Sequence, residues 1–158
     1  MKQLTDQEKS YIGGFLDGDG CVNAQIVRRK DYVLKFQIRV SVTFFQSTKR
    51  KWFLIFLKKK LKMGTLRNRP DGITELKIVG AESVCKLLLA LQPYILVKRR
   101  QTRLVLSIIE KLTQSKRDPI AFLTLCAIAD KFEFLNDSKK REVTSVTVQD
   151  LFKKERIL

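Results

Sequence analysis

The residues best suited to chemistry lie at positions 11–20, which read Tyr-Ile-Gly-Gly-Phe-Leu-Asp-Gly-Asp-Gly. Two adjacent glycines inside a predicted helix cost about 1 kcal/mol each relative to alanine, which a chain tolerates where two backbones must approach closely. The helix then ends in Asp17-Gly18-Asp19-Gly20, where unpaired carbonyls and two carboxylates form an oxygen-rich, negative pocket. Such a pocket suits a hard cation such as Mg²⁺, although an ordinary helix end with an acidic turn is the plainer alternative.

The same segment predicts self-association. One acidic cluster provides too few ligands to hold two metal ions at a catalytic site, unless a second chain supplies a second acidic cluster. An EF-hand is excluded because the twelfth residue counted from Asp17 is Arg28, where a glutamate would be needed. A homodimer packed through the glycine-bearing helix would bring two Asp19 side chains together at a two-fold axis. The residues expected at that interface are Ile12, Gly13, Gly14 and Phe15.

Composition narrows the class of protein. At 158 residues, 44% of them hydrophobic, the chain suits a single folded domain over residues 1–158. The 32 basic residues against 16 acidic ones give a net charge of +16, which favours nucleic acid as the partner. Histidine is absent, which excludes Ser-His-Asp triads, histidine zinc sites and histidine-metal nuclease motifs. The three cysteines form no CxxC pair and no run of about 18 apolar residues occurs, so we expect a soluble protein without a zinc site, disulfide framework or membrane span.

Alternating apolar and polar residues predict two strands at positions 22–29 and 34–45. A period of two is typical of strands with one buried face, and the polar run 28–31 between them predicts a hairpin. A second hairpin is predicted at 66–78 around Pro70-Asp71-Gly72. Between Gly20 and Arg69 the only acid is Asp31, so the exposed faces are basic and polar. Such a ribbon fits the major groove of duplex DNA, although a basic face that is merely solvated is the alternative.

The odd-numbered side of these strands provides the side chains that we expect to read base edges. They are Asn23, Gln25, Arg29, Gln37, Arg39, Ser41 and Thr43 in the first hairpin, and Arg67, Arg69 and Lys77 in the second. Lys139, Lys140 and Arg141 are expected to bind phosphates, which adds affinity without sequence information. Val27 and Phe45 interrupt the polar pattern and would either touch thymine methyl groups or fill space.

Helical spacing predicts the remaining elements. Thr5 and Glu8 form a capping box that opens a helix running to about Asp17. Apolar residues recur at helical spacing at 84–91 and 104–112, Asp118-Pro119 opens a helix towards Leu135, and a last helix includes residues 151–152. A helix at 52–61 is predicted from the spacing of Trp52, Phe53, Phe56, Leu57 and Leu61. The order of helix, hairpin, helix, hairpin, helix and further helices predicts an α+β fold.

Residues 12–20 resemble the signature helix of the LAGLIDADG homing endonucleases, with Gly13 where relatives usually carry alanine. Residues 46–53, 91–94 and 135–139, together with Lys98, look like further blocks of this family in matching order. The likeness covers nearly the whole chain and points to the single-motif homodimeric group typified by the green-algal chloroplast intron-encoded enzyme. It implies an αββαββα core with a saddle-shaped antiparallel sheet that lies in the major groove, and additional C-terminal helices.

The resemblance also implies an activity. Members of the group bind a long pseudopalindromic site in double-stranded DNA as homodimers and hydrolyse one phosphodiester bond per strand with a divalent metal, leaving 3′ overhangs and promoting intron mobility. Asp19 would be the metal ligand with the Gly18 carbonyl beside it, and Gln46, Arg50 and Lys98 would organise water and phosphate at the scissile bond.

The cofactor implied by the resemblance is Mg²⁺, with Mn²⁺ substituting and Ca²⁺ binding without supporting cleavage. No small-molecule cofactor and no membrane partner are expected. The resemblance implies an organellar location, in the chloroplast.

Two other functions remain open from the sequence. An RNA maturase that assists intron splicing belongs to the same family, but a two-stranded ribbon does not fit the narrow major groove of A-form RNA. A non-catalytic DNA-binding protein would have no use for the acidic cluster at Asp17 and Asp19.

Overall fold

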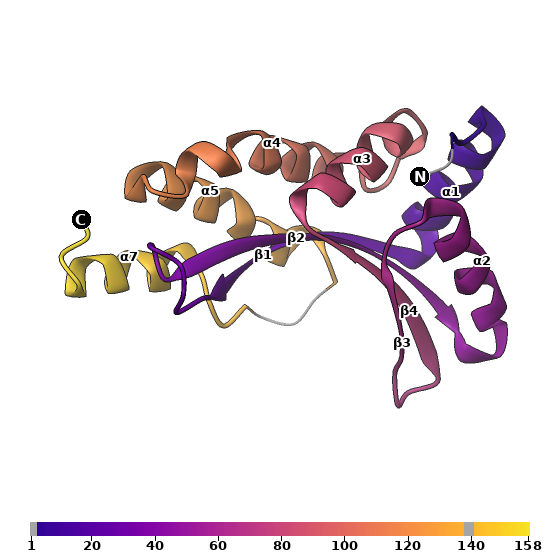
Figure 1. Ribbon diagram of the computed structural model, residues 1–158, viewed down its shortest axis with the longest axis horizontal. Coiled ribbons are helices and arrows are strands. Elements are labelled where there is room, and N and C mark those ends of the chain that lie inside the picture. Colours follow the sequence, from indigo (N-terminus) through magenta and orange to yellow (C-terminus); the bar gives the residue numbers. More distant parts are fainter. Residues whose placement is uncertain (1–2, 138–140) are drawn as a thin grey trace. The chain divides into compact units, whose positions relative to one another are not determined.

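The computed structural model describes residues 3–137 and 141–158, and the chain forms two compact units. The first unit contains the residues up to Val22 together with 41–102, and the second contains 23–40 and 103–158. The helices and strands follow in the order α1 (Asp6–Asp19), β1 (Gly20–Arg28), β2 (Phe36–Ser47), η1 (Thr48–Arg50), α2 (Lys51–Leu61), β3 (Thr65–Asn68), β4 (Ile73–Val79), α3 (Ala81–Leu91), η2 (Gln92–Tyr94), α4 (Arg99–Ser115), α5 (Pro119–Asp130), α6 (Phe132–Leu135) and α7 (Ser145–Lys154) (Figure 1). This order confirms the predicted α+β fold, with an αββαββα core and additional C-terminal helices.

The first helix begins where the capping box places it. The Glu8 amide donates to Thr5 Oγ1 over 3.2 Å, and the Thr5 amide donates to Glu8 Oε2 over 2.9 Å, which satisfies two amides of the first turn. The helix continues to Asp19, two residues beyond the predicted end, so Asp17 and Gly18 lie in its last turn. Ile12 and Leu16 point into the core and are almost completely buried.

The strands form one sheet in the order β1-β2-β4-β3. Strand β2 pairs antiparallel with β4 so that Phe44 lies opposite Leu76, and both side chains are fully buried. The next pair, Thr43 and Lys77, lies on the other face, as the period of two predicts. The predicted turn between β3 and β4 is present, and Gly72 adopts a φ of +80° there, a conformation that favours glycine.

Helix α2 presents a different side to the core than its aromatic spacing suggests. The buried residues are Leu54, Leu57 and Leu61, on the side that contacts β3 and β4. Trp52 and Phe56 are exposed over 65% and 52% of their surface. Two apolar stripes therefore run along this short helix, and only the leucine stripe packs against the sheet.

The second unit is held together by contacts of α5 and α7 (Figure 1). The ring of Phe152 on α7 lies 6.4 Å from that of Phe122 on α5 and 6.5 Å from that of Phe36 on β2. The helix predicted from Asp118 to Leu135 is interrupted, because the chain tightens at Lys131, whose amide donates to the Ile128 carbonyl over 3.2 Å. The result is α5, followed by the single turn of α6.

Candidate functional site

Asp17 ties the end of α1 to the segment that precedes α4. Its Oδ2 accepts hydrogen bonds from the amides of Leu96 and Val97, over 2.7 and 3.1 Å, and its Oδ1 accepts one from the Lys98 amide over 3.0 Å. The Lys98 ammonium donates to the backbone carbonyl of Asp17 over 2.5 Å. The carboxylate accepts hydrogen bonds from three backbone amides, so Asp17 acts as a structural acid at the helix end.

The electrostatic environment keeps Asp17 ionised. Partial burial by itself raises the pKa of this carboxyl, but the amides of Leu96, Lys98 and Val97 and the positive charge of Lys98 outweigh it. The net effect lowers the pKa of Asp17 below its ordinary value, because hydrogen bonds from amides stabilise the charged form.

Asp19 has a different environment from Asp17. Its side chain is exposed, and within the part of the chain that the structure describes its carboxylate accepts no hydrogen bond and forms no ion pair. Gly18, which precedes it, has open space where a side chain would lie. A free carboxylate beside the carbonyls of a helix C-terminus provides the hard oxygen donors that a divalent cation prefers.

One chain does not complete such a site. Among residues 3–137 and 141–158, no three His, Cys, Asp or Glu side chains lie close enough together to hold a metal ion. Asp19 and the Gly18 carbonyl therefore fit a divalent cation in chemical type, but two further His, Cys, Asp or Glu side chains of the described chain do not join them.

Gln46 and Arg50 form a second pair of predicted site residues, at the end of β2 and in η1. The Gln46 side-chain oxygen accepts from the Arg50 Nε over 3.0 Å and from the Ser47 amide over 2.9 Å. These two donors orient the amide group of Gln46 so that its NH₂ is left to donate. No hydrogen bond joins this pair to Lys98 within the described chain.

The two glycines of α1 have separate roles. A Cβ on Gly13 would approach the Cβ of Tyr94 to 3.0 Å and its carbonyl oxygen to 3.3 Å, so this glycine allows α1 to pack on η2 in the same chain. A Cβ on Gly14 would meet nothing within 4 Å. Of the four residues predicted at a dimer interface, Ile12 and Gly13 are buried in their own chain, whereas Gly14 is exposed and Phe15 is half-buried.

Exposed aromatic side chains lie on α1 and on the neighbouring helix α2, and the sequence patterns did not predict that they would be exposed. They are Tyr11 on α1, which is 64% exposed, and Trp52 and Phe56 on α2. Phe53 links them, since its ring centre lies 6.0 Å from those of both Tyr11 and Trp52 and 6.3 Å from that of Phe56. We call these four residues the aromatic surface.

The predicted DNA-reading residues of the first unit are partly covered. Ser41 and Thr43 lie on the expected face of β2 but are only 6% and 7% exposed. Arg67 pairs with Glu75, its cross-strand neighbour, over 3.0 Å. Arg69 pairs with Asp71 over 2.7 Å. Two acids that follow Arg69 in the sequence, Asp71 and Glu75, thus neutralise arginines on this basic face. The charge count between Gly20 and Arg69 did not include them.

In the second unit, Asn23 is held by neighbouring side chains. Its Oδ1 accepts from Arg141 over 2.6 Å and from Asn136 over 3.3 Å, and Arg141 also donates to the Ala24 carbonyl over 2.6 Å. The amide of Asn23 is therefore oriented with its NH₂ group left to donate.

The hairpin between β1 and β2 holds another predicted arginine. Arg29 binds both carboxylate oxygens of Asp31, over 2.9 and 3.1 Å, and donates to Gln37 over 3.2 Å. Gln25 and Arg39 are half-buried on the strands. Lys139 and Lys140, predicted to bind phosphates, lie outside the described residues.

Comparison with known proteins decides the family. The model of the LAGLIDADG endonuclease family matches residues 12–109, more than half of the chain. The chain belongs to this family. The match begins at Ile12 on α1 and so includes Asp17, Asp19, Gln46, Arg50 and Lys98.

Two curated proteins similar to the chain are DNA endonucleases from algae. The chain is 47% identical over 150 residues to the DNA endonuclease I-CvuI of Chlorella vulgaris, which covers 94% of this chain and 92% of that protein. It is 37% identical over 139 residues to the DNA endonuclease I-CreI of Chlamydomonas reinhardtii, covering 88% of this chain and 85% of that protein.

Solved structures agree with the family fold. The crystal structure of I-CvuI in complex with its DNA target, in the presence of calcium, matches with a TM-score of 0.88 and 44% identity over 94% of each chain. The archaeal intron-encoded homing endonuclease I-Vdi141I, complexed with DNA, matches with a TM-score of 0.82 over 97% of this chain, but at 18% identity it supports the fold alone.

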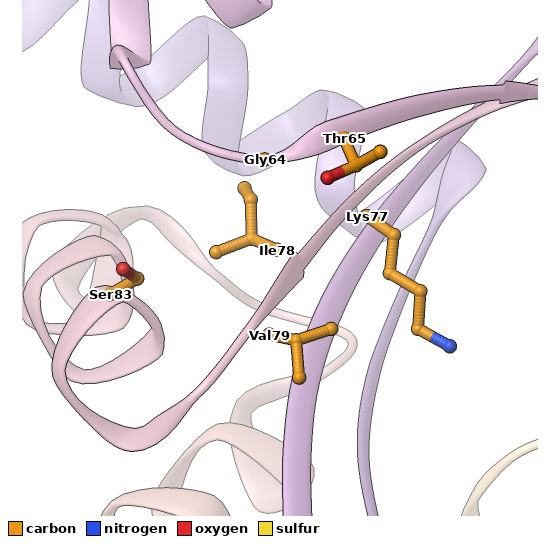
Figure 2. Close-up of a pocket in the computed structure, with 6 residues that line it drawn as sticks. All are labelled: Gly64, Thr65, Lys77, Ile78, Val79 and Ser83. Atoms are coloured by element: carbon orange, nitrogen blue, oxygen red, sulfur yellow. The ribbon is translucent and has the colours of Figure 1, made fainter.

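A shallow cavity of about 250 Å³ lies beside strands β3 and β4, and none of the predicted catalytic residues lines it. Its lining residues are Gly64, Thr65, Lys77, Ile78, Val79 and Ser83. Figure 2 shows the Lys77 side chain pointing away from Ser83, so the two polar ends do not converge on a common point.

In the described part of the chain, none of the helices is both long and apolar enough to cross a bilayer.

Proposed function

We propose that this chain is a homing endonuclease that acts as a homodimer on double-stranded DNA. The observation that carries the proposal is the exposed, unpaired carboxylate of Asp19 at the end of α1, in the same turn that binds the Lys98 ammonium. A negatively charged metal ligand beside a cation suits hydrolysis of a phosphodiester, where charge accumulates on the phosphate oxygens. The similarity to I-CvuI and I-CreI, both DNA endonucleases, supports the same activity.

The residues of the site divide the chemistry among them. Asp19 and the Gly18 carbonyl would hold a divalent cation, for which Mg²⁺ is proposed. Such an ion activates the attacking water and neutralises charge on the leaving oxygen. Lys98 and Arg50 contribute positive charge to the transition state, and the NH₂ group of Gln46 donates a hydrogen bond to water or phosphate. No histidine base is then required.

Dimerisation would complete the metal site. Gly14 offers an open backbone surface on α1, and a second copy of the helix packed there would place two Asp19 carboxylates near the two-fold axis. The aromatic surface continues this face and would be covered by the same contact, which removes exposed apolar area from water. Each monomer then cuts one strand, leaving 3′ overhangs in a long pseudopalindromic site.

Recognition of DNA would use the polar face of the strands. Asn23, Gln25 and Arg39 would read base edges in the major groove, with the remaining residues predicted above, while Arg141 would either bind phosphate or support Asn23. We further propose that Mn²⁺ replaces Mg²⁺, that Ca²⁺ binds without supporting cleavage, and that the enzyme acts in the chloroplast to promote intron mobility.

The test uses a library of randomised duplex sites incubated with the purified protein and Mg²⁺. Cleaved molecules with 3′ overhangs are selected, and Asp19→Asn is then assayed on the selected site. The variant should bind this site with unchanged affinity and cleave it at least ~1,000-fold more slowly. That loss of rate corresponds to roughly 4 kcal/mol of activation free energy, as expected for the loss of a metal ligand. Cleavage by Asp19→Asn at the wild-type rate would refute the assignment.

A further inference from the structure

Asp17 provides most of the hydrogen bonds that hold the segment carrying Lys98, and a further backbone bond of residues 96–98 runs from the Thr102 amide in α4 to the Lys98 carbonyl over 3.0 Å. Ile95 is buried and fixes one end, but the next two side chains, Leu96 and Val97, are 69% and 74% exposed. Apolar burial therefore does not determine where residues 96–98 lie. Their three amides all donate to one carboxylate, that of Asp17, from a segment 79 to 81 positions away in the sequence.

Lys98 is held by the same residue at both ends. Its amide donates to Asp17 Oδ1, and its ammonium donates to the Asp17 carbonyl. The ammonium is thereby placed at the C-terminus of α1, where the helix dipole favours a positive charge, one residue before Gly18 and two before Asp19. An ammonium has three donors, and among the described residues Asp17 takes only one of them, which leaves two for a phosphate.

We propose that Asp17 is the positioning residue for Lys98, an inference that rests on the nuclease function proposed above. Asp17 reaches no substrate itself. It sets the position of the Lys98 ammonium in two ways. Its carboxylate accepts hydrogen bonds from the three amides before α4, and its backbone carbonyl accepts one from the ammonium itself. This assigns different tasks to the two acids of the motif: Asp19 meets the metal, and Asp17 fixes the cation that meets the phosphate.

The geometry requires a carboxylate. Three amides approach the two oxygens from the same segment, so both atoms must be acceptors. An asparagine would turn its NH₂ group towards at least one of these amides, and two donors would then face each other. Asp17→Asn should therefore release residues 96–98 while leaving the size of the side chain unchanged.

The experiment is a double-mutant cycle with Asp17→Asn and Lys98→Met on the selected DNA site. Asp17→Asn should lower the single-turnover cleavage rate by about 10- to 100-fold, the loss expected when a catalytic group is misplaced by about 1 Å, and change DNA affinity by less than about threefold. In the Lys98→Met background the same change should lower the rate by less than about threefold, because there is no ammonium left to misplace.

A matched control makes the same substitution at another aspartate that accepts hydrogen bonds from backbone amides. At the start of α5 a single oxygen of Asp118, Oδ1, accepts both amides, each over 3.0 Å, and an asparagine oxygen can replace it, so Asp118→Asn should leave both the melting temperature and the cleavage rate close to those of the wild type. Asp17→Glu keeps an acceptor-only group and should cleave faster than Asp17→Asn. This second variant keeps the test decisive if Asp17→Asn folds poorly.

Hydrogen exchange separates this inference from the nuclease function. The amides of residues 96–98 should exchange faster in Asp17→Asn than in the wild type, and Asp118→Asn should leave them unchanged, whether or not any DNA is cut. Multiplicative rate losses in the cycle, or wild-type cleavage by Asp17→Asn, would overturn the positioning role. If faster exchange occurs but neither the wild type nor any variant cuts a site, the nuclease function fails while the contact itself stands.

Discussion

Replacing Gly14 by alanine should raise the stability of the monomer and weaken the dimer. The position is helical and exposed, and an added Cβ meets nothing within 4 Å in its own chain. The change therefore gains the helix propensity of alanine over glycine, about 0.8–1 kcal/mol, or an increase of about 2–4 °C in melting temperature for a chain of this size. In the dimer, the same methyl group would separate two backbones that must lie close together.

The cost to association follows from packing. Inserting a methyl group into a close contact costs about 1–3 kcal/mol, which weakens the dimer by roughly 5- to 150-fold in Kd. Sedimentation over a range of concentrations measures the dimer Kd, and thermal unfolding at the lowest concentration measures the monomer. Thr113→Ala, on an exposed position of α4, is the matched control, because it also gains helix propensity but should leave the dimer Kd unchanged. A Gly14→Ala variant that dimerises like the wild type would refute an interface along this face of α1.

Two further predictions concern charge and titration. Glu75→Gln should free Arg67 from its ion pair and remove a negative charge from the sheet face. Non-specific DNA binding at low salt, measured by fluorescence anisotropy, should therefore tighten, and the slope of log K against log salt should steepen by about 1. An unchanged slope would mean that this face does not contact DNA. Burial, followed by the charge of Asp130, raises the pKa of the Cys126 thiol to about 12, so this thiol should resist alkylation at pH 8–9 while the two half-buried cysteines react. The folded chain holds the Cys126 proton more tightly than the unfolded chain, so this group should lower stability as the pH rises above 9 and through 12, and labelling of Cys126 as fast as the others would contradict the burial.

Local patterns were sufficient to predict most of the fold. The alternation from Leu34 to Phe45 predicted β2 because one face of the strand packs on the core, and the capping box at Thr5 predicted where α1 begins. The pattern at 52–61 predicted a helix correctly but did not determine which of its sides is buried. In α2, the aromatic stripe and the leucine stripe both have helical spacing, and the packing of β3 and β4 selected the leucines.

The site was predictable only where its residues are close in sequence. The spacing of Asp17 and Asp19 showed an acidic helix end, but nothing local distinguishes an acid that accepts three amides from one left free. That difference depends on residues 96–98, which follow the sheet and α3 in the sequence and contact the end of α1 from 79 to 81 positions away. The pairing of Arg67 with Glu75 was hidden for the same reason, since cross-strand register decides which charges become neighbours.

The position of the chain's single tryptophan provides an intrinsic optical probe. Trp52 lies on the aromatic surface, so in a lone subunit its indole is in contact with water and should emit at long wavelength. When a second subunit covers that surface, the emission should shift towards the blue without any change in the fold. The two assembly states can therefore be distinguished by their native fluorescence, with no dye attached, even at the low concentrations where subunits separate.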